Sequence, residues 1–270
     1  MKISFYITFL ALVWWLEFFP VMAQRASVIE LDETGIWNGL YIKGRISNKI
    51  GYYGEHHLRL RNKLDDVTSF VGRTRQIYNR AGINILFNNY FEAVIGPTLV
   101  WNYSPNPENV NFEKTVLEPR IWHQWLFMMP QMGRFKIYHQ FRFEHRWRRS
   151  NAIGSSYDYT NRYRYKFFVY VPLNKKTIEV HSLFFSPSAE IFMHSGRSIV
   201  NNPFEDFRTY NGIGYVLSPK VTLFAGHMWT LGQRSSGFEY KTSHILRFNV
   251  LVGLDFRKLD TKLPQINLGY

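Results

Sequence analysis

Residues 133–150, GRFKIYHQFRFEHRWRRS, alternate between apolar and charged positions with a period of two. The odd positions from Phe135 to Trp147 are aromatic, aliphatic or histidine, and most even positions are Arg, Lys, Gln or Glu. Successive side chains of a strand point to opposite faces, so the pattern predicts a strand with one apolar and one charged face. Such a strand is either an edge strand whose apolar face packs on a protein core, or a strand of a membrane barrel. In the barrel the apolar face contacts lipid and the charged face lines the lumen.

The same alternation recurs along the chain and predicts an all-β fold. Short connections such as 48–51 alternate with longer ones such as 63–74, which is typical of antiparallel transmembrane β-barrels with short periplasmic turns and longer external loops. Eleven strands are expected at 37–47, 52–62, 75–88, 91–103, 114–128, 134–149, 158–171, 177–193, 205–217, 221–231 and 241–256. A twelfth is expected at 26–33, because a barrel with both ends in the periplasm needs an even number, and ten strands is the alternative.

The N-terminal segment has the layout of a secretory signal. A lysine at position 2 precedes a mostly apolar run up to Trp15, and Ala23 ends the segment. The run is shorter than the roughly 18 to 20 residues that span a membrane, which disfavours an uncleaved anchor. We therefore expect a cleaved signal peptide at 1–23, a barrel at 24–256 and a C-terminal tail at 257–270, located in the outer membrane of a Gram-negative bacterium.

Composition narrows the class of protein further. The formal net charge is +13, and removing residues 1–23 leaves it unchanged, because Lys2 and Glu17 cancel. Aromatic residues make up 18 %, which could suit a nucleic-acid binder with stacking platforms, but export from the cytoplasm argues against nucleic acid as a partner. The chain has no cysteine, so disulfides cannot stabilise it.

The charged faces of the predicted strands define a candidate site in the lumen. The forked guanidinium group of an arginine in a narrow, partly desolvated barrel requires a carboxylate partner. The expected partners are Glu55, Glu118, Glu144, Glu190 and Asp255. Because there are too few acids, the lumen is expected to be positive and to attract anions. The ladder of lumen charges comprises Glu118, Arg120, Arg142, Glu144, Arg146, Arg162, Arg164, Glu190, Arg208 and Arg247.

The apolar faces are expected to contact outer-membrane lipid. His139 and His145 fall on this face and need an interface, a neutral state or a covering neighbour. Aromatic residues near strand ends are candidates for the interfacial girdle of such barrels: Trp101, Trp122, Trp125, Trp147, Tyr159, Tyr215 and Trp229.

The charged strands also resemble a known family. The spacing matches domain of unknown function family 2490 (DUF2490) of Gram-negative outer-membrane proteins over roughly 37–256. Its Glu-x-Arg, Arg-x-Glu-x-Arg, Arg-x-Arg and Arg-x-Tyr-x-Gly-x-Gly-Tyr strands correspond to 118–120, 142–146, 162–164 and 208–215. Thr209 and Asn211 stand where the family usually has apolar residues. The resemblance implies an outer-membrane barrel and assigns no activity.

Several functions stay open from the sequence. The ladder either only braces the barrel, or it lines a narrow anion-favouring channel, or it binds an anionic small molecule or lipid phosphate. A membrane-embedded lipid hydrolase is an alternative, with His181–Ser182 and His194–Ser195 as nearby pairs, although adjacent strand residues face opposite ways. A structural component of an envelope assembly, with unknown protein partners, is another. No motif for a cofactor or a metal is present in the sequence, and no catalytic residue is predicted.

Overall fold

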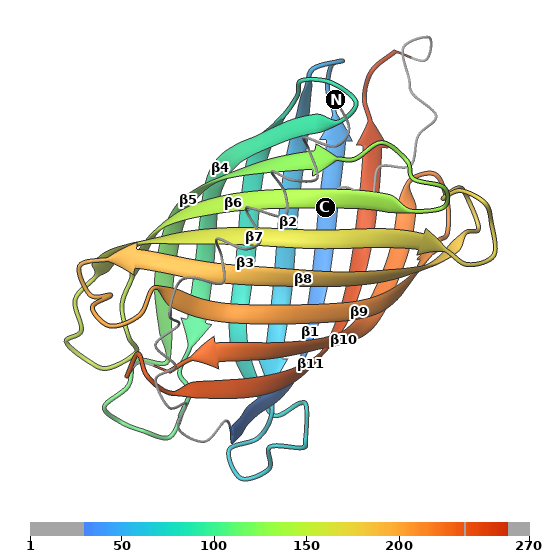
Figure 1. Ribbon diagram of the computed structural model, residues 1–270. Helices are drawn as coiled ribbons and strands as arrows, with labels where there is room; N and C mark the ends of the chain where they lie inside the picture. The colour runs from blue at the N-terminus through green and yellow to red at the C-terminus, as the bar shows by residue number, and fades with distance from the viewer. Residues whose placement is uncertain (1–29, 235, 259–270) are drawn as a thin grey trace, which may run out of the picture.

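The computed structural model describes residues 30–234 and 236–258. Within them, eleven strands close into one barrel, and each strand pairs with its neighbour in sequence (Figure 1). Neighbours pair antiparallel, whereas the closing pair of β1 and β11 is parallel. The strands are β1 (Glu30–Arg45), β2 (Ile50–Arg61), β3 (Arg73–Leu86), β4 (Phe91–Tyr103), β5 (Thr115–Met128), β6 (Lys136–Arg148), β7 (Asp158–Pro172), β8 (Leu183–Gly196), β9 (Phe204–Val216), β10 (Val221–Gln233) and β11 (Tyr240–Asp255).

The prediction of twelve strands, and the alternative of ten, are both wrong for the described residues. The segment 30–33 of the predicted first strand does not turn back; it continues directly into Trp37, so one strand replaces two. Backbone pairing holds this long strand, with Glu33 opposite Ser243 of β11 and Trp37 opposite Arg59 of β2. Because β1 and β11 are parallel, β1 begins at the opposite end of the barrel from the end where β11 finishes.

The two ends of the barrel differ in their connections. The connections after β1, β3, β5, β7 and β9 lie at one end, here called the turn end, and those after β2, β4, β6, β8 and β10 lie at the other, the loop end.

The strand predicted at 177–193 begins only at Leu183. Residues 177–182 belong to the turn, because the Ser182 hydroxyl donates to the Thr177 carbonyl at 3.2 Å and Asn174 Oδ1 accepts from the Leu183 N–H at 2.8 Å.

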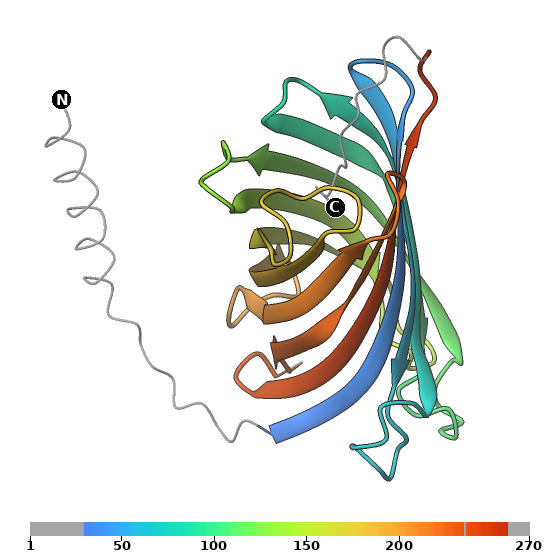
Figure 2. The ribbon, with the colours of Figure 1, turned by 90° about the vertical axis from the view of Figure 1, so that its right-hand side faces the viewer.

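Opposite walls of the barrel cross each other. In Figure 1, β6 to β9 run across the front while β1 to β3 run steeply along the far wall, and Figure 2 shows the two walls from the side. Since neighbouring strands of a sheet are twisted relative to one another, a closed sheet places strands of distant sequence face to face across the interior. Side chains of β1 to β3 therefore meet side chains from β6 to β9 inside the barrel.

The polar faces point inward and the apolar faces outward. In β6, Gln140, Arg142, Glu144 and Arg146 are buried, and Phe141 between them is exposed. Among the described residues, 27 polar or charged residues are buried against 19 apolar ones, and residues such as Ile121, Trp125 and Phe248 are exposed outside. The predicted period-two pattern is thus confirmed.

One aromatic residue departs from the expected girdle. Trp122 lies inside the barrel with no exposed surface, whereas Trp125 and Trp147 are exposed on the outside. Trp122 shares the parity of Arg120 and Gln124, so the pleat directs all three inward.

The outward histidines have partners on the next strand. His139 Nδ1 lies 2.8 Å from the Tyr165 hydroxyl, and His145 Nδ1 lies 2.8 Å from the Tyr159 hydroxyl. Neighbouring side chains therefore provide a hydrogen-bond partner for one ring nitrogen of each histidine on the apolar face. No helix in residues 30–234 and 236–258 is long and apolar enough to cross a membrane.

Candidate functional site: the charged lumen

Glu144 is the centre of an ion-pair network that crosses the lumen. Its side chain is completely buried, and its carboxylate lies 2.8 Å from the guanidinium nitrogens of Arg80, Arg120 and Arg164. Arg162 lies 3.5 Å away. Glu144 lies on β6, and its arginine partners come from the two flanking strands, β5 and β7, and from the more distant β3. One carboxylate therefore links four strands.

A second buried carboxylate extends the network toward β2. Glu55 accepts a hydrogen bond from Arg80 at 2.5 Å, lies 3.0 Å from His57 Nε2 and lies 3.8 Å from Arg142. Arg80 therefore bridges Glu55 and Glu144, and its side chain is only 1 % exposed. Both carboxylates of the pair are satisfied by charge-assisted hydrogen bonds, which compensate the cost of burial.

The network becomes more accessible toward the loop end. There Glu205 accepts from Arg162 at 2.5 Å and from Arg146 at 2.9 Å, and Arg148 lies 3.9 Å away. The exposed fraction rises from 0 % for the Glu144 side chain to 17 % for Arg162 and 45 % for Arg148. Solvent therefore reaches this half of the lumen from the loop end.

The turn end of the lumen is filled by an apolar cluster. It comprises buried residues near the turn-end termini of their strands and others deeper in the wall: Tyr53, Val94, Trp122, Leu126, Tyr138, Phe168, Tyr170, Phe184, Val216 and Leu251. The Tyr138 and Phe168 rings stack at a centroid distance of 4.8 Å, and Phe184 meets Tyr170 edge-on at 5.2 Å. A buried ion pair between Lys43 and Glu92 lies beside the same end. Buried side chains therefore pack inside the lumen on the turn-end side of the charged network.

Between the cluster and the loop end lies a cavity of about 170 Å³, here called the basic cavity. Twelve Arg and Lys side chains line it, against the three carboxylates Glu55, Glu118 and Glu190. Four further carboxylates, those of Glu33, Glu144, Glu205 and Asp206, form ion pairs with lining arginines. Cations around the basic cavity therefore outnumber these carboxylates by five.

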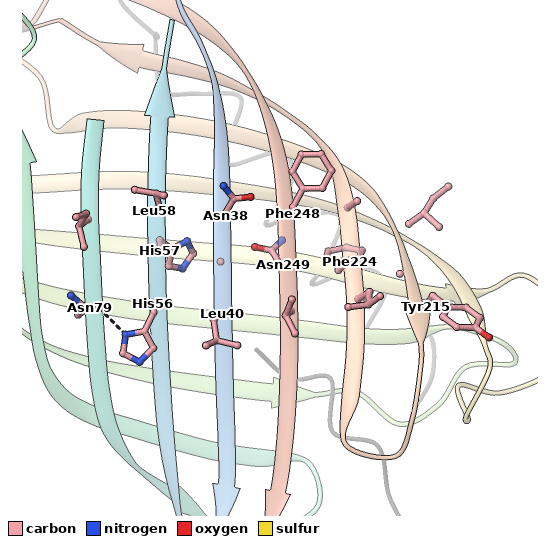
Figure 3. A pocket seen from close by; sticks show the side chains of 17 residues that line it. Asn38, Leu40, His56, His57, Leu58, Asn79, Tyr215, Phe224, Phe248 and Asn249 are labelled. Atoms are coloured by element: carbon pink, nitrogen blue, oxygen red, sulfur yellow. Dashed lines mark hydrogen bonds between the residues drawn. The ribbon is translucent and has the colours of Figure 1, made fainter. Parts of the chain in front are cut away.

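A larger hollow of about 900 Å³ lies over β1, β2 and β9 to β11 (Figure 3). Its outward-facing lining includes Leu40, Leu58 and Phe248, all exposed. Its polar side chains include His56, whose Nδ1 lies 2.7 Å from Asn79 Oδ1 on β3. Among the described residues, no carboxylate, Arg or Lys lines this hollow, in contrast to the basic cavity.

All ten residues of the predicted ladder lie in the lumen wall, and their role as a site stays a prediction. Cross-strand pairing joins Arg120 to Glu144 as expected, and Arg164 reaches Glu190 at 2.7 Å. Arg208 pairs with Asp206, and Arg247 donates to the Tyr41 hydroxyl at 3.0 Å. Asp255, another expected partner, forms an ion pair with Arg257, beyond the end of β11.

Several members of the site were not predicted from the sequence. Arg80, Arg75, Glu205 and Trp37 line or support the basic cavity and were not among the expected residues. A signal for Arg80 is present in the sequence, since Tyr78 and Arg80 are two positions apart on one face of a predicted strand. No spacing rule indicates Glu205, because its arginine partners lie on β6 and β7.

The candidate Ser–His pairs do not form a catalytic arrangement. His194 lines the lumen side, whereas the Ser195 hydroxyl lies 3.2 Å from the Tyr163 hydroxyl on the outside. Ser182 donates to the Thr177 carbonyl, and His181 Nδ1 lies 3.0 Å from the Tyr215 hydroxyl. In the described part of the chain, no group of three or more His, Asp or Glu side chains is arranged to hold a metal ion.

The fold and the site define a closed β-barrel whose lumen carries a basic ion-pair network. The family model described as a protein of unknown function (DUF2490) matches residues 34–241, so the chain belongs to the DUF2490 family and the predicted resemblance is confirmed. No curated protein matches the sequence significantly. Among solved structures, the NanC porin in a rhombohedral crystal form is similar at 10 % identity and a TM-score of 0.46, over 79 % of this chain and 91 % of that chain.

Proposed function

We propose that this protein is an outer-membrane β-barrel that binds a small anion in the basic cavity. The observation that carries the proposal is a cavity lined by twelve cationic side chains and closed on one side by the apolar cluster. The ligand enters from the loop end, where the arginine side chains are most exposed.

The distribution of polar and apolar side chains supports the membrane location. The strands have 12 to 16 residues each, more than the roughly 9 to 11 that a tilted strand needs to span a bilayer. Their outward faces are rich in apolar and aromatic residues, and their charged faces point into the lumen. This arrangement is typical of outer-membrane barrels, and outer-membrane lipid is then the partner of the outer face.

The filled turn end favours binding over conduction. An ion that enters from the loop end meets the buried aromatic side chains of Tyr53, Trp122 and Phe184, none of which is exposed. Crossing this layer would replace the water around the ion mostly by aromatic and aliphatic side chains, which is unfavourable. The lumen therefore functions as a one-ended pocket, and the structural role of the ion pairs is to hold its wall.

The size and charge of the basic cavity limit the ligand. A cavity of about 170 Å³ has room for several waters, which suits a small oxyanion or the charged head of a larger molecule. Lys166 contacts the Phe168 ring at 4.8 Å, and within the described residues it forms no ion pair with a carboxylate. Such surplus cations attract an anion and are neutralised by it.

Equilibrium binding to the purified barrel in detergent tests this function. The probes are inorganic phosphate, sulfate and acetate, with a quaternary ammonium cation as the control, each measured by calorimetry at low and at high sodium chloride. The expected result is saturable binding of at least one anion, one per barrel, that weakens as salt rises and is absent for the cation. Absence of saturable anion binding in a folded barrel would overturn the proposal. Steady ion conduction by the same preparation would support a channel in its place.

A further inference from the structure

Trp37 lies between arginines on both neighbouring strands. In the register of β1, it is opposite Arg59 of β2 on one side and Arg247 of β11 on the other. All three residues line the basic cavity, and Trp37 is only 2 % exposed. The indole is therefore held inside a cationic wall and not in the girdle of the outer face.

Three guanidinium groups surround the Trp37 ring. The guanidinium carbon of Arg59 lies 4.1 Å from a Trp37 ring centroid, that of Arg75 lies 5.4 Å away, and that of Arg208 lies 5.5 Å away. Cation–π contact with the indole holds these groups close together despite their equal charge. Arg75 pairs with Glu33 and Arg208 pairs with Asp206, whereas Arg59 is hydrogen-bonded to the neutral side chain of Gln76 at 2.9 Å.

The groups that lack a partner in this cluster are hydrogen-bond donors. Within the described part of the chain, the buried N–H groups of Trp37 Nε1 and Arg59 Nε have no acceptor, and neither has Arg247 Nε beside them. An indole N–H and a guanidinium N–H can only donate, so the group that satisfies them must be an acceptor. Because the guanidinium groups of Arg59, Arg75 and Arg208 surround these donors, the acceptor that fits is an anionic oxygen.

We infer that Trp37, Arg59, Arg75 and Arg208 form the binding subsite for a phosphate-type oxyanion, with the Trp37 N–H donating to one of its oxygens. The four donor groups come from β1, β2, β3 and β9, and four donors suit a group with three or four oxygens better than a carboxylate with two. The phosphate belongs either to a lipid headgroup or to a free ion, since both offer the same oxygens. This inference rests on the proposed function and specifies where in the basic cavity the anion binds.

The test is calorimetric binding of inorganic phosphate to the refolded full-length barrel and to three variants. Trp37→Phe keeps an aromatic ring and removes the indole N–H donor. Arg59→Gln removes the guanidinium group that pairs with no carboxylate among the described residues. The control, Arg197→Gln, removes an equal charge from an exposed connection. The inference expects phosphate affinity to fall about tenfold or more for the first two variants and to stay unchanged for the third. Heat-modified gel mobility and far-UV circular dichroism establish that each variant is folded. If Arg59→Gln is not folded, Arg59→Lys takes its place, and a fall in phosphate affinity is expected there because an ammonium lacks the fixed fork of donors of a guanidinium.

The outcomes separate this inference from the proposed function. Phosphate affinity that is unchanged in folded Trp37→Phe and Arg59→Gln, but lower in Arg146→Gln, would overturn the subsite and leave the anion-binding barrel standing. No phosphate or other anion binding to the wild type would overturn both. Glycerol 3-phosphate serves as a second probe: tighter binding than inorganic phosphate supports the subsite with a lipid headgroup as the source, and equal or weaker binding that depends on Trp37 supports it with free phosphate.

Discussion

Arg80 on β3 donates to Glu144 on β6 at 2.8 Å, although 64 positions and two intervening strands separate them. The same guanidinium group bonds Glu55 on β2, so one side chain joins three strands through the lumen. A direct bond over this span indicates that the barrel interior is narrow at this level. The ion-pair network is thus both the internal bracing of the barrel and the wall of the basic cavity.

The first prediction concerns the centre of this network. Replacing Glu144 by Gln removes the charge that pairs with Arg80, Arg120 and Arg164 and leaves buried cations without compensation. We expect the free energy of unfolding to fall by about 3 to 5 kcal/mol. Urea denaturation of the barrel in detergent, followed by tryptophan fluorescence, measures the change.

The matched control is Glu108→Gln, which makes the same chemical change at an exposed position in the connection after β4. We expect less than about 0.5 kcal/mol there. An unfolding free energy for Glu144→Gln equal to that of the control would mean that water screens the network, and the bracing role would be wrong.

A second prediction tests the packing of the apolar cluster. A side-chain Cβ at Gly214 would lie 2.1 Å from the Phe184 ring, so this ring occupies the space that glycine leaves free. Gly214→Ala should destabilise the barrel by about 1 to 3 kcal/mol through overpacking. Gly232→Ala on β10 is the control, because its nearest neighbour would be an ordinary contact at 3.9 Å. Equal melting temperatures for the two variants would show that Phe184 moves aside freely.

A third prediction concerns the loop end. Arg149 donates to both Glu113 oxygens, at 2.5 and 2.7 Å, and these hydrogen bonds hold the pKa of Glu113 below its usual range. Beside this pair, Phe112 and Ala152 form an isolated backbone bridge between two connections. A lowered carboxyl pKa in the folded state means that the pair stabilises the loops above the unfolded pKa of about 4.3 and loses this effect as pH falls through the folded pKa.

Hydrogen exchange of the amides in 104–114 measures this dependence. After correction for intrinsic exchange, we expect protection to fall as the pH is lowered from about 4.3 through the folded pKa of Glu113. In Glu113→Gln, protection should be low at every pH. Protection in the wild type that does not respond to pH would contradict a role of this ion pair in ordering the loop end.

Much of the fold follows from local patterns, whereas the site depends on closure. The alternation in 134–149 indicates which face of β6 is inward, because parity is a local property of a strand. The number of strands was predicted incorrectly because it depended on an assumed turn before Trp37, where the backbone in fact continues in one strand. The bond between Arg80 and Glu144 could not be predicted, since it depends on the width of the barrel and on how its walls cross.

Current through single barrels in a planar bilayer tests the central claim, a basic lumen closed at the turn end, most directly. The wild type is compared with a variant in which Tyr53, Trp122 and Phe184 are all alanine, and both proteins are delivered from proteoliposomes in which the amount of inserted, folded barrel has been measured. We predict no steady current steps for the wild type and anion-selective steps for the variant. Steady steps of similar size from both proteins would contradict the claim, because the lumen would then be open in the wild type.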